Sequence, residues 1–257
     1  MKNCLDLTGR TAVVIGATSG LGRTLAAGLA QHGADVVATG RRRGRVEEVC
    51  AEIRATGRRT LAEPVDTKDR SSLEQLRDRV IAEFGTVHIL INAAGTTFRK
   101  ATAGISATEW SAVFETNLQG VLEACQTFYE PLKQSGSGRI INIASLGSFV
   151  AFLEVAPYCA SKAAVLSLTR SLGCEWARDG ICVNAIAPGV FPTELNAQLL
   201  NGTERGREIL LRTPMRRFGK PEELVGAAVL LASEAASFIT GQCIVVDGGF
   251  LASGVNT

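Results

Sequence analysis

The stretch that decides the fold is Thr11-Ala-Val-Val-Ile15-Gly16-Ala-Thr-Ser-Gly20-Leu-Gly22, near the start of the chain. Its first five residues form a continuous apolar run, which is typical of a strand covered on both faces. Leu21, Leu25 and Leu29 follow at helical spacing, and Gly33 is placed to end that helix. A strand, a glycine-rich turn and a helix in this order predict a dinucleotide pocket, because glycines let the backbone approach a pyrophosphate and the helix start attracts negative charge. A plain strand-to-helix connection is the alternative.

The alternation of strand and helix continues along the chain. Strands are expected at 35–39, 60–65, 87–91, 139–144, 181–186 and 242–246. Helices are expected at 46–56, from Ser71, from Ser106 to about 133, at 160–178 and at 221–233. Ser-x-x-Glu capping boxes at Ser71 and Ser106 mark two of the helix starts.

Strict alternation predicts an α/β fold, namely a single-domain Rossmann fold over residues 1–257 with a seven-stranded parallel sheet and helices on both faces. Residues 191–219 are the exception, since they are long for a connection. We expect them to form a substrate lid with a little helix of its own; a decorative insertion is the alternative.

The composition excludes several classes of protein. A net charge of +2 over 257 residues is too small to indicate a nucleic-acid or membrane surface. No signal segment opens the chain and no apolar run is long enough to span a bilayer, so we expect a soluble, cytoplasmic protein. The seven cysteines form no C-x-x-C pair and only two histidines are present, so no metal site is predicted and the thiols should be reduced.

The second strand ends at Gly40-Arg41-Arg42, where a dinucleotide fold binds the adenosine ribose. An acidic residue there would bind the 2′-hydroxyl of NAD(H), whereas an arginine accommodates a 2′-phosphate. No acid is present, so Arg41, backed by Arg42, favours NADP(H) over NAD(H). The alternatives are that these arginines solvate the helix start or that the run contacts nucleic acid.

A second group of candidate residues lies between 145 and 162. Tyr158 and Lys162 stand four apart, so they share a face if the segment is helical. A nearby ammonium lowers the pKa of a phenol, which makes Tyr158 a candidate general acid/base. Ser145 ends a strand-like run, where open α/β sheets bind their ligands, and is a candidate to hold a substrate oxygen. A chance pair on a solvated helix is the alternative for Tyr158 and Lys162.

With these residues in view, the chain resembles the short-chain dehydrogenase/reductase family, in its single-domain form, over nearly its whole length. The matching motifs and residues, in chain order, are Gly16-x-x-x-Gly20-x-Gly22, Asn92-Ala-Ala-Gly95, Asn117, Ser145, Tyr158-x-x-x-Lys162 and Pro188-Gly189 with Thr193. The resemblance implies hydride transfer between a nicotinamide cofactor and a carbonyl or alcohol carbon. It implies that Tyr158 moves the oxygen-bound proton, that Lys162 lowers its pKa and holds the nicotinamide ribose, and that Ser145 polarises the substrate oxygen.

The resemblance also implies supporting roles. Asn117 would kink its helix and hold a water, Asp66 would face the adenine, and the segment from Pro188 to Thr193 would receive the carboxamide. The implied cofactor-binding set is Gly16, Thr18, Ser19, Gly20, Leu21, Gly22, Arg41, Arg42, Asp66, Thr67, Asn92, Ala93, Ala94, Gly95, Tyr158, Lys162, Pro188, Gly189, Val190 and Thr193. Two positions depart from the family pattern: Ile15 replaces a threonine, and Ala93 replaces the second asparagine of Asn-Asn-Ala-Gly.

The segment after Gly95 faces the cleft in this architecture. It looks similar to that of members acting on sugar acids, such as gluconate 5-dehydrogenase, so Arg99 is a candidate partner for a substrate carboxylate beside Ser145 and Tyr158. A plain surface arginine is the alternative. The runner-up activity is that of a 3-oxoacyl-carrier-protein reductase, and a hypothesis from another class is a cofactor sensor without turnover.

The family's usual assembly is a homotetramer of two-fold symmetry. It is built on the helices that contain Asn117 and Tyr158 and on the last helix and strand. Apolar residues there fit an interface but would equally suit the core: Val229, Leu230, Ile244 and Val246.

Overall fold

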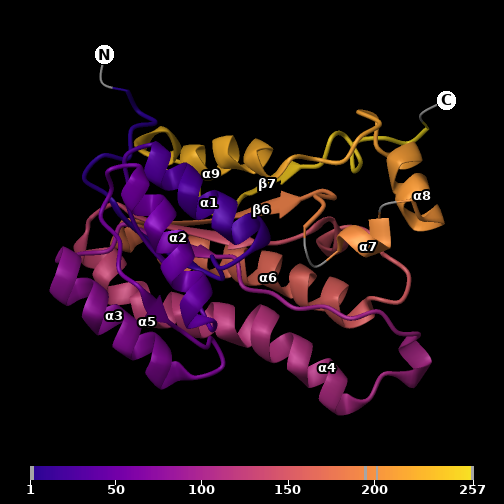
Figure 1. Ribbon diagram of the computed structural model, residues 1–257, viewed down its shortest axis with the longest axis horizontal. Coiled ribbons are helices and arrows are strands. Elements are labelled where there is room, and N and C mark those ends of the chain that lie inside the picture. The colour runs from indigo at the N-terminus through magenta and orange to yellow at the C-terminus, as the bar shows by residue number, and fades with distance from the viewer. Residues whose placement is uncertain (1–2, 194–195, 201, 256–257) are drawn as a thin grey trace.

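A computed structural model describes residues 3–193, 196–200 and 202–255. Seven parallel strands form one sheet in the order β3-β2-β1-β4-β5-β6-β7, with helices on both faces (Figure 1). The strands are β1 (Thr11–Ile15), β2 (Asp35–Gly40), β3 (Glu63–Pro64), β4 (Ile89–Asn92), β5 (Gly138–Ile143), β6 (Ile181–Pro188) and β7 (Cys243–Val246). The predicted fold class, a seven-stranded parallel sheet of Rossmann type, is confirmed.

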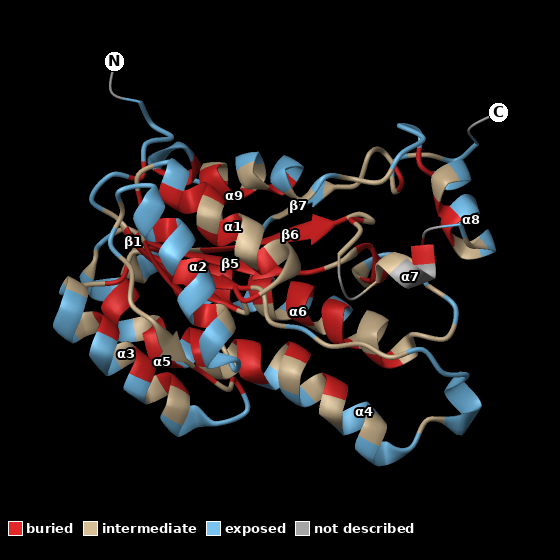
Figure 2. Cartoon of the chain, in the orientation of Figure 1, coloured by how far each residue is buried: buried red, intermediate tan, exposed pale blue. Residues whose placement is uncertain are grey.

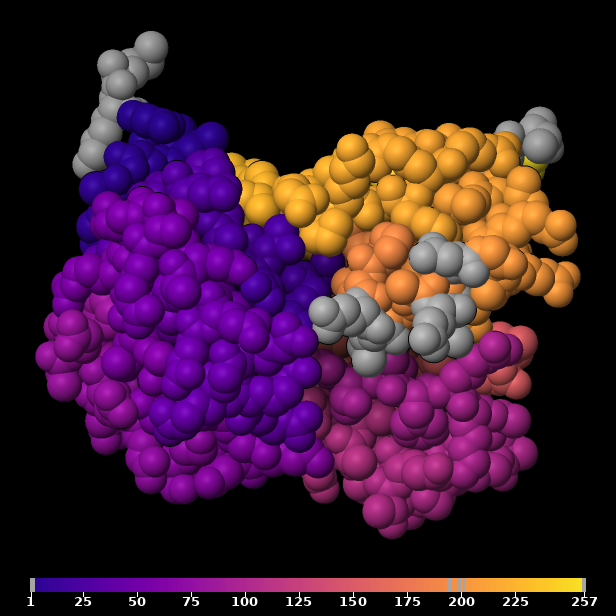
Figure 3. Space-filling model, viewed as in Figure 1, coloured from indigo at the N-terminus to yellow at the C-terminus, as the bar shows by residue number. Residues whose placement is uncertain are grey.

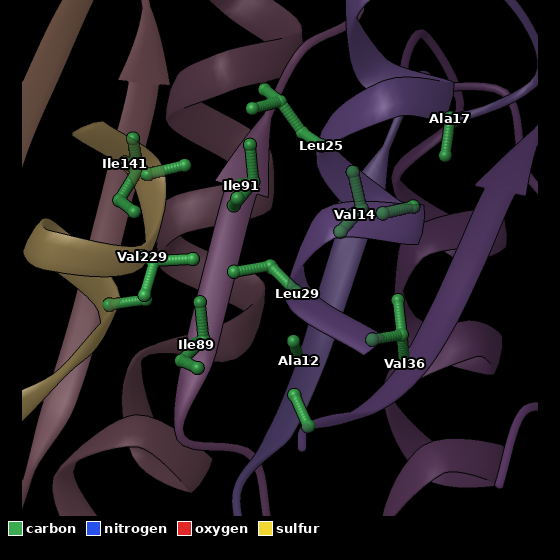
Figure 4. Packing of buried hydrophobic residues seen from close by; sticks show 14 of the residues in the cluster. Ala12, Val14, Ala17, Leu25, Leu29, Val36, Ile89, Ile91, Ile141 and Val229 are labelled. Carbon is green, nitrogen blue, oxygen red and sulfur yellow. The ribbon is translucent and has the colours of Figure 1, made fainter. Parts of the chain in front are cut away.

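The core forms one apolar layer on each face of the sheet. Helices α1 (Gly20–Gln31), α2 (Arg43–Ala55) and α9 (Val225–Ala232) cover one face, where Leu25, Leu29 and Val229 pack on the strands (Figure 4). Helices α3 (Arg70–Phe84), α5 (Gly120–Gln134) and α6 (Ala156–Glu175) cover the other. Because successive strand residues point to opposite faces, a strand covered twice must be apolar throughout. Burial is accordingly nearly continuous through the five central strands, whereas the edge strands β3 and β7 are only partly covered, and exposed residues lie on the outer helix faces (Figure 2).

The helix expected from Ser106 to about 133 is present in three parts. Helix α4 (Ala107–Phe114) passes through a π-helical segment, Glu115–Gln119, into α5. The capping box of Ser106 with Glu109 is confirmed. The box expected at Ser71 is wrong: α3 begins one residue earlier, and Asp69 accepts the hydrogen bond from the Ser71 backbone N–H. A carboxylate is as good a cap as a hydroxyl, and this one comes first in the chain.

Several other boundaries differ from the prediction by a few residues: α2 begins at Arg43, β4 begins at Ile89, and a 3₁₀ turn at Pro221–Leu224 precedes α9. The strand expected over 60–65 is reduced to β3, because this strand lies at the sheet edge, where its only sheet neighbour is β2, and Pro64 has no N–H to donate. Helix α6 begins at Ala156 rather than near 160, with Pro157 in its first turn, where a missing N–H costs nothing.

The expected lid, 191–219, contains two short helices, α7 (Ala197–Leu200) and α8 (Glu204–Arg212); its residues 194–195 and 201 lie outside the described residues. Leu200 and Ile209 pack with Leu146 and Phe250 in a cluster separate from the main core. In the space-filling view this orange segment and the magenta region around α4 lie on one side of a seam, and the indigo and purple surface of the earlier part of the chain lies on the other (Figure 3). Among the described residues, no helix is both long and apolar enough to cross a membrane.

Candidate active site

The glycine turn between β1 and α1 has no room for side chains at two of its glycines. A Cβ at Gly16, whose φ is +84°, would collide with the backbone of Ala94, and a Cβ at Gly22 would collide with the carbonyl oxygen of Gly16. The turn therefore packs directly on the segment that follows β4. Ser19, the N-cap of α1, makes no side-chain capping bond. A tight turn leading into a helix start without a side-chain cap is the arrangement that suits a phosphate group.

The end of β2 lies against this turn. Thr39 O accepts hydrogen bonds from the N–H groups of Gly16 and Ala17, at 3.0 and 2.9 Å. The Arg42 guanidinium reaches Ser19 Oγ at 3.5 Å, and Arg41 beside it is exposed. Two cations thus stand at the rim of the glycine turn, where the sequence predicts them.

The other residues expected on the adenosine side follow β3 and β4. The Asp66 carboxylate accepts the Lys68 N–H at 3.1 Å, and Thr67 is buried against Gly120 of α5. Asn92 is 2% exposed and donates from Nδ2 to Asn142 Oδ1 at 2.9 Å. Its side chain therefore braces β4 against β5.

The π segment presents Asn117 to the site. This side chain is fully buried, accepts the Thr96 N–H at 2.8 Å, and donates to Thr96 O at 2.9 Å and to Ser161 Oγ at 3.0 Å. Ser161 Oγ in turn donates to Tyr158 O at 2.7 Å. Asn117 thus ties the segment after β4 to the first turns of α6.

Ser145, Tyr158 and Lys162 meet beyond the carboxyl ends of β4 and β5. A side-chain hydrogen bond joins Ser145 to the phenol of Tyr158. Lys162, 4% exposed, donates from Nζ to Ile143 O at 2.7 Å and lies 5.9 Å from the centre of the Tyr158 ring. A Cβ at Gly95 would lie 3.6 Å from this Nζ, so the segment after β4 closes the other side.

The lowered pKa expected for the Tyr158 phenol is wrong for this structure. Burial raises the pKa of the Tyr158 phenol, and the hydrogen bond from Ser145 offsets only part of that rise. Burial also lowers the pKa of Lys162 to about 8. Helical spacing predicts the proximity of the two groups, but it carries no information on how far both are removed from water. At neutral pH the phenol keeps its proton and most of the lysine is charged.

The segment after β6 returns to the glycine turn. The Gly189 N–H donates to Val246 O at 2.8 Å, and Val190 O accepts the Gly219 N–H at 3.0 Å. A Cβ at Gly20 would touch Thr193 Cγ2 at 3.4 Å. The structure therefore brings Thr193 beside the start of α1, as the dinucleotide pattern requires.

Arg99, the candidate partner for a substrate carboxylate, is already paired with a carboxylate of this chain. Its Nε lies 2.6 Å from Glu154 Oε2. Sequence reasoning missed Glu154, because an acid in a loop belongs to no periodic pattern. Its position four residues before Tyr158 was the available signal.

The family model described as "Enoyl-(Acyl carrier protein) reductase" matches residues 16–251. A 2-dehydro-3-deoxy-D-gluconate 5-dehydrogenase from Dickeya dadantii (strain 3937) is 41% identical, over 97% of this chain and 98% of its own. A gluconate 5-dehydrogenase from Gluconobacter oxydans (strain 621H) is 37% identical, over 96% and 97%.

A solved structure extends the match to three dimensions. It is the crystal structure of a gluconate 5-dehydrogenase from Burkholderia cenocepacia J2315 in complex with NADP and tartrate. It superposes with a TM-score of 0.94 at 36% identity and 98% coverage of each chain. The chain therefore belongs to the short-chain dehydrogenase/reductase family of NAD(P)-dependent oxidoreductases.

Proposed function

We propose that this protein is an NADP(H)-dependent dehydrogenase/reductase that interconverts a ketone and a secondary alcohol on a sugar acid. The observation that carries the proposal is that the buried Lys162 lies with the partly buried Ser145 and Tyr158 at the end of a sheet whose first turn has room for a pyrophosphate. The sugar-acid class rests on the relatives, whose names specify gluconate and 2-dehydro-3-deoxy-D-gluconate.

The residues present fit a nicotinamide dinucleotide. The glycine turn admits a pyrophosphate because Gly16 and Gly22 have no side chains, and Arg41 with Arg42 would take a 2′-phosphate. Asp66 and Thr67 would line the adenine side, and the segment from Pro188 to Thr193 would hold the carboxamide. The bound cofactor supplies or accepts the hydride.

The protein's own groups move the proton. In the reduction, Tyr158 gives its phenol proton to the carbonyl oxygen, and in the oxidation it takes the proton back. The raised pKa of Tyr158 keeps that proton in place at neutral pH until a substrate oxygen arrives. Lys162, charged beside the ring, favours the phenolate as it forms, and Ser145 donates to the same substrate oxygen. Asn117 positions the segments that carry them.

We also propose a homotetramer of a single-domain protein, with residues 191–219 as a lid and the cytoplasm as its compartment. Strand β7 at the sheet edge is only partly covered, and Val245 on it is 37% exposed. Leu230, Ile244 and Val246 remain candidates for such an interface, whereas Val229 is 2% exposed within the core and is not available for one. All seven cysteines are free thiols, which suits a reducing compartment. Light scattering on the purified protein measures the assembly.

The test is oxidation of NADPH and NADH in the presence of 5-keto-D-gluconate, related keto sugar acids and an acetoacetyl thioester. Turnover of a keto acid with NADPH supports the proposal. Turnover of the thioester alone assigns the runner-up activity, reduction of a carrier-linked 3-oxoacyl group. Tight NADPH binding without turnover of any carbonyl would point to a cofactor sensor, although such a protein has no need of the Ser145, Tyr158 and Lys162 arrangement.

A further inference from the structure

Two basic residues follow each other after β4, and the structure separates their roles. Lys100 Nζ lies 2.8 Å from both carboxylate oxygens of Glu109. Glu109 also completes the capping box of α4, and these bonds hold the pKa of its carboxyl at about 2. The ammonium of Lys100 is therefore paired with Glu109 at the start of α4. Arg99 pairs instead with Glu154, which belongs to no helix or strand.

The segment that carries Arg99 runs alongside the start of α6. At one end Gly95 lies beside Lys162, and at the other the Lys100 N–H donates to Glu154 O at 2.8 Å. Tyr158 lies between Glu154 and Lys162 in the sequence. The segments before α4 and before α6 both lie at the end of the molecule that carries α7 and α8 (Figure 1). The Arg99–Glu154 pair thus joins the segment that follows Gly95 to the loop that leads into the helix of Tyr158 and Lys162.

Glu154 is held in an unusual backbone conformation. Its φ is +65°, in the left-handed region that non-glycine residues seldom adopt. The Lys100 hydrogen bond anchors its carbonyl, and Arg205 of α8 donates to Leu153 O at 3.4 Å. These contacts aim a carboxylate at Arg99 from the loop that leads into α6. Side-chain exposures of 46% for Arg99 and 32% for Glu154 leave the pair accessible to a small anion.

We propose that Glu154 is a specificity-determining residue whose carboxylate occupies Arg99 in place of the substrate carboxylate, which must displace it to bind. The inference rests on the proposed function and adds to it: the acid group of the substrate and Glu154 compete for one guanidinium. The competition weakens binding of acidic substrates, and it covers Arg99 when none is bound. An uncharged substrate has no carboxylate to bind Arg99, so its binding does not compete with the Arg99–Glu154 ion pair.

The test uses Glu154→Gln, which keeps the size and backbone preference of the residue but removes the charge. The expected result is a KM for 5-keto-D-gluconate lowered about fivefold, with kcat within about twofold of wild type, since an exposed ion pair contributes up to about that factor. The dissociation constant of D-gluconate, measured by calorimetry with NADP+ present, should fall by the same factor. L-sorbose carries a hydroxymethyl group where 5-keto-D-gluconate carries the carboxylate, and its KM should not change.

Two further variants isolate the pair. In an Arg99→Gln background the effect of Glu154→Gln should vanish, because the guanidinium for which the two carboxylates compete is gone. Glu83→Gln removes a comparably exposed ion pair, with Arg59, at the end of α3 and should leave both KM values unchanged.

The failures are distinguishable. Turnover of the keto acid with an unchanged or raised KM in Glu154→Gln overturns this inference and leaves the proposed function standing. Wild-type turnover of L-sorbose or the thioester but not of any keto acid, with no binding of gluconate, overturns the proposed function and this inference with it.

Discussion

Asn117 Nδ2 donates to Ser161 Oγ at 3.0 Å, which joins the π segment to α6 inside the core. The same amide makes two hydrogen bonds to the backbone of Thr96. One side chain therefore holds three segments: the loop after β4, the long helix and the helix of Tyr158. The π segment matters because it is the local change of helical register that turns Asn117 toward both partners.

Replacing Asn117 with Ala should lower both stability and turnover. Three buried hydrogen bonds are lost and the Thr96 backbone groups lose their partner, so we expect a loss of about 2–3 kcal/mol in the free energy of unfolding. Displacement of the residues around Tyr158 should lower kcat about 10- to 100-fold with a smaller change in KM. Denaturant unfolding and steady-state kinetics measure the two effects. Gln119→Ala, an exposed position in the same π segment, is the control; a purely structural role for Asn117 would leave kcat per folded molecule unchanged.

Tyr158→Phe should abolish proton transfer while leaving cofactor binding intact. Loss of a general acid costs about 10²–10⁴-fold in kcat, and phenylalanine keeps the aromatic ring and its packing. The chain offers a matched control, because Tyr129 is its one other tyrosine. Its hydroxyl donates to Asp179 at 2.8 Å at the opposite end of α6, so Tyr129→Phe should remain active. Equal loss in both variants, or retained turnover in Tyr158→Phe, would contradict the assignment.

The sequence predicted what depends on local chemistry. The apolar run into Gly16, the Ser106 capping box and the alternation of strands and helices along the chain are all present, because each is set by residues close together in the chain. The prediction failed where two possible N-caps lay close together: Ser71 with Glu74 matched a capping box, but Asp69 is the N-cap of α3.

The sequence could not predict the properties that depend on tertiary structure, namely the pKa values of buried groups and the partner of Arg99. The four-residue spacing of Tyr158 and Lys162 indicated a lowered phenol pKa, but the surrounding segments exclude water from both groups, and this burial raises the pKa of the phenol. The partner of Arg99 was hidden for a related reason. Glu154 is 55 residues away in the sequence, and strands β4 and β5 bring their following loops together.

Arg41 and Arg42 should set the choice of cofactor. We expect the double change to Ala to lower kcat/KM for NADPH about 10- to 100-fold, since a 2′-phosphate loses charge-assisted hydrogen bonds, and to change kcat/KM for NADH by less than about threefold. Kinetics with both cofactors give the ratio directly. Arg45→Ala, on the same surface but paired with Glu48 at 3.1 Å, should leave the ratio unchanged. If NADPH and NADH lose equally, the arginines act on the helix start rather than on the phosphate.

Lys162→Met should be inactive and, below pH 8, more stable than the wild type. The pKa of Lys162 is about 8 in the folded protein against 10.5 for the free side chain, so burial of the charged form costs on the order of 3 kcal/mol. Between these two values the unfolded chain holds a proton that the folded protein has lost. Wild-type stability contributed by this residue therefore rises from pH 8 to pH 10.5.

The variant avoids that cost but leaves Ile143 O without its donor, so its net gain should be about 2 kcal/mol at pH 7 and should disappear above pH 10.5. Urea unfolding at several pH values measures the difference. Lys133→Met, which removes an exposed lysine paired with Asp179, supplies the comparison and should show no such gain. A variant less stable than wild type at every pH would mean that the hydrogen bond to Ile143 outweighs the desolvation.

Gly22→Ala should prevent cofactor binding and destabilise the fold. The added Cβ collides with the backbone carbonyl of Gly16, and neither residue can move away because β1 and α1 hold their backbones in place. We expect a loss of about 2–4 kcal/mol in the free energy of unfolding, as for other overpacked core positions, and no detectable quenching of protein fluorescence by NADPH. Gly44→Ala is the matched control. A Cβ at Gly44 has no neighbour within 4 Å and lies in the first turn of α2, so alanine should leave NADPH binding intact and leave stability equal or slightly higher. If Gly22→Ala folds and binds NADPH as well as Gly44→Ala does, the glycine turn does not carry the pyrophosphate.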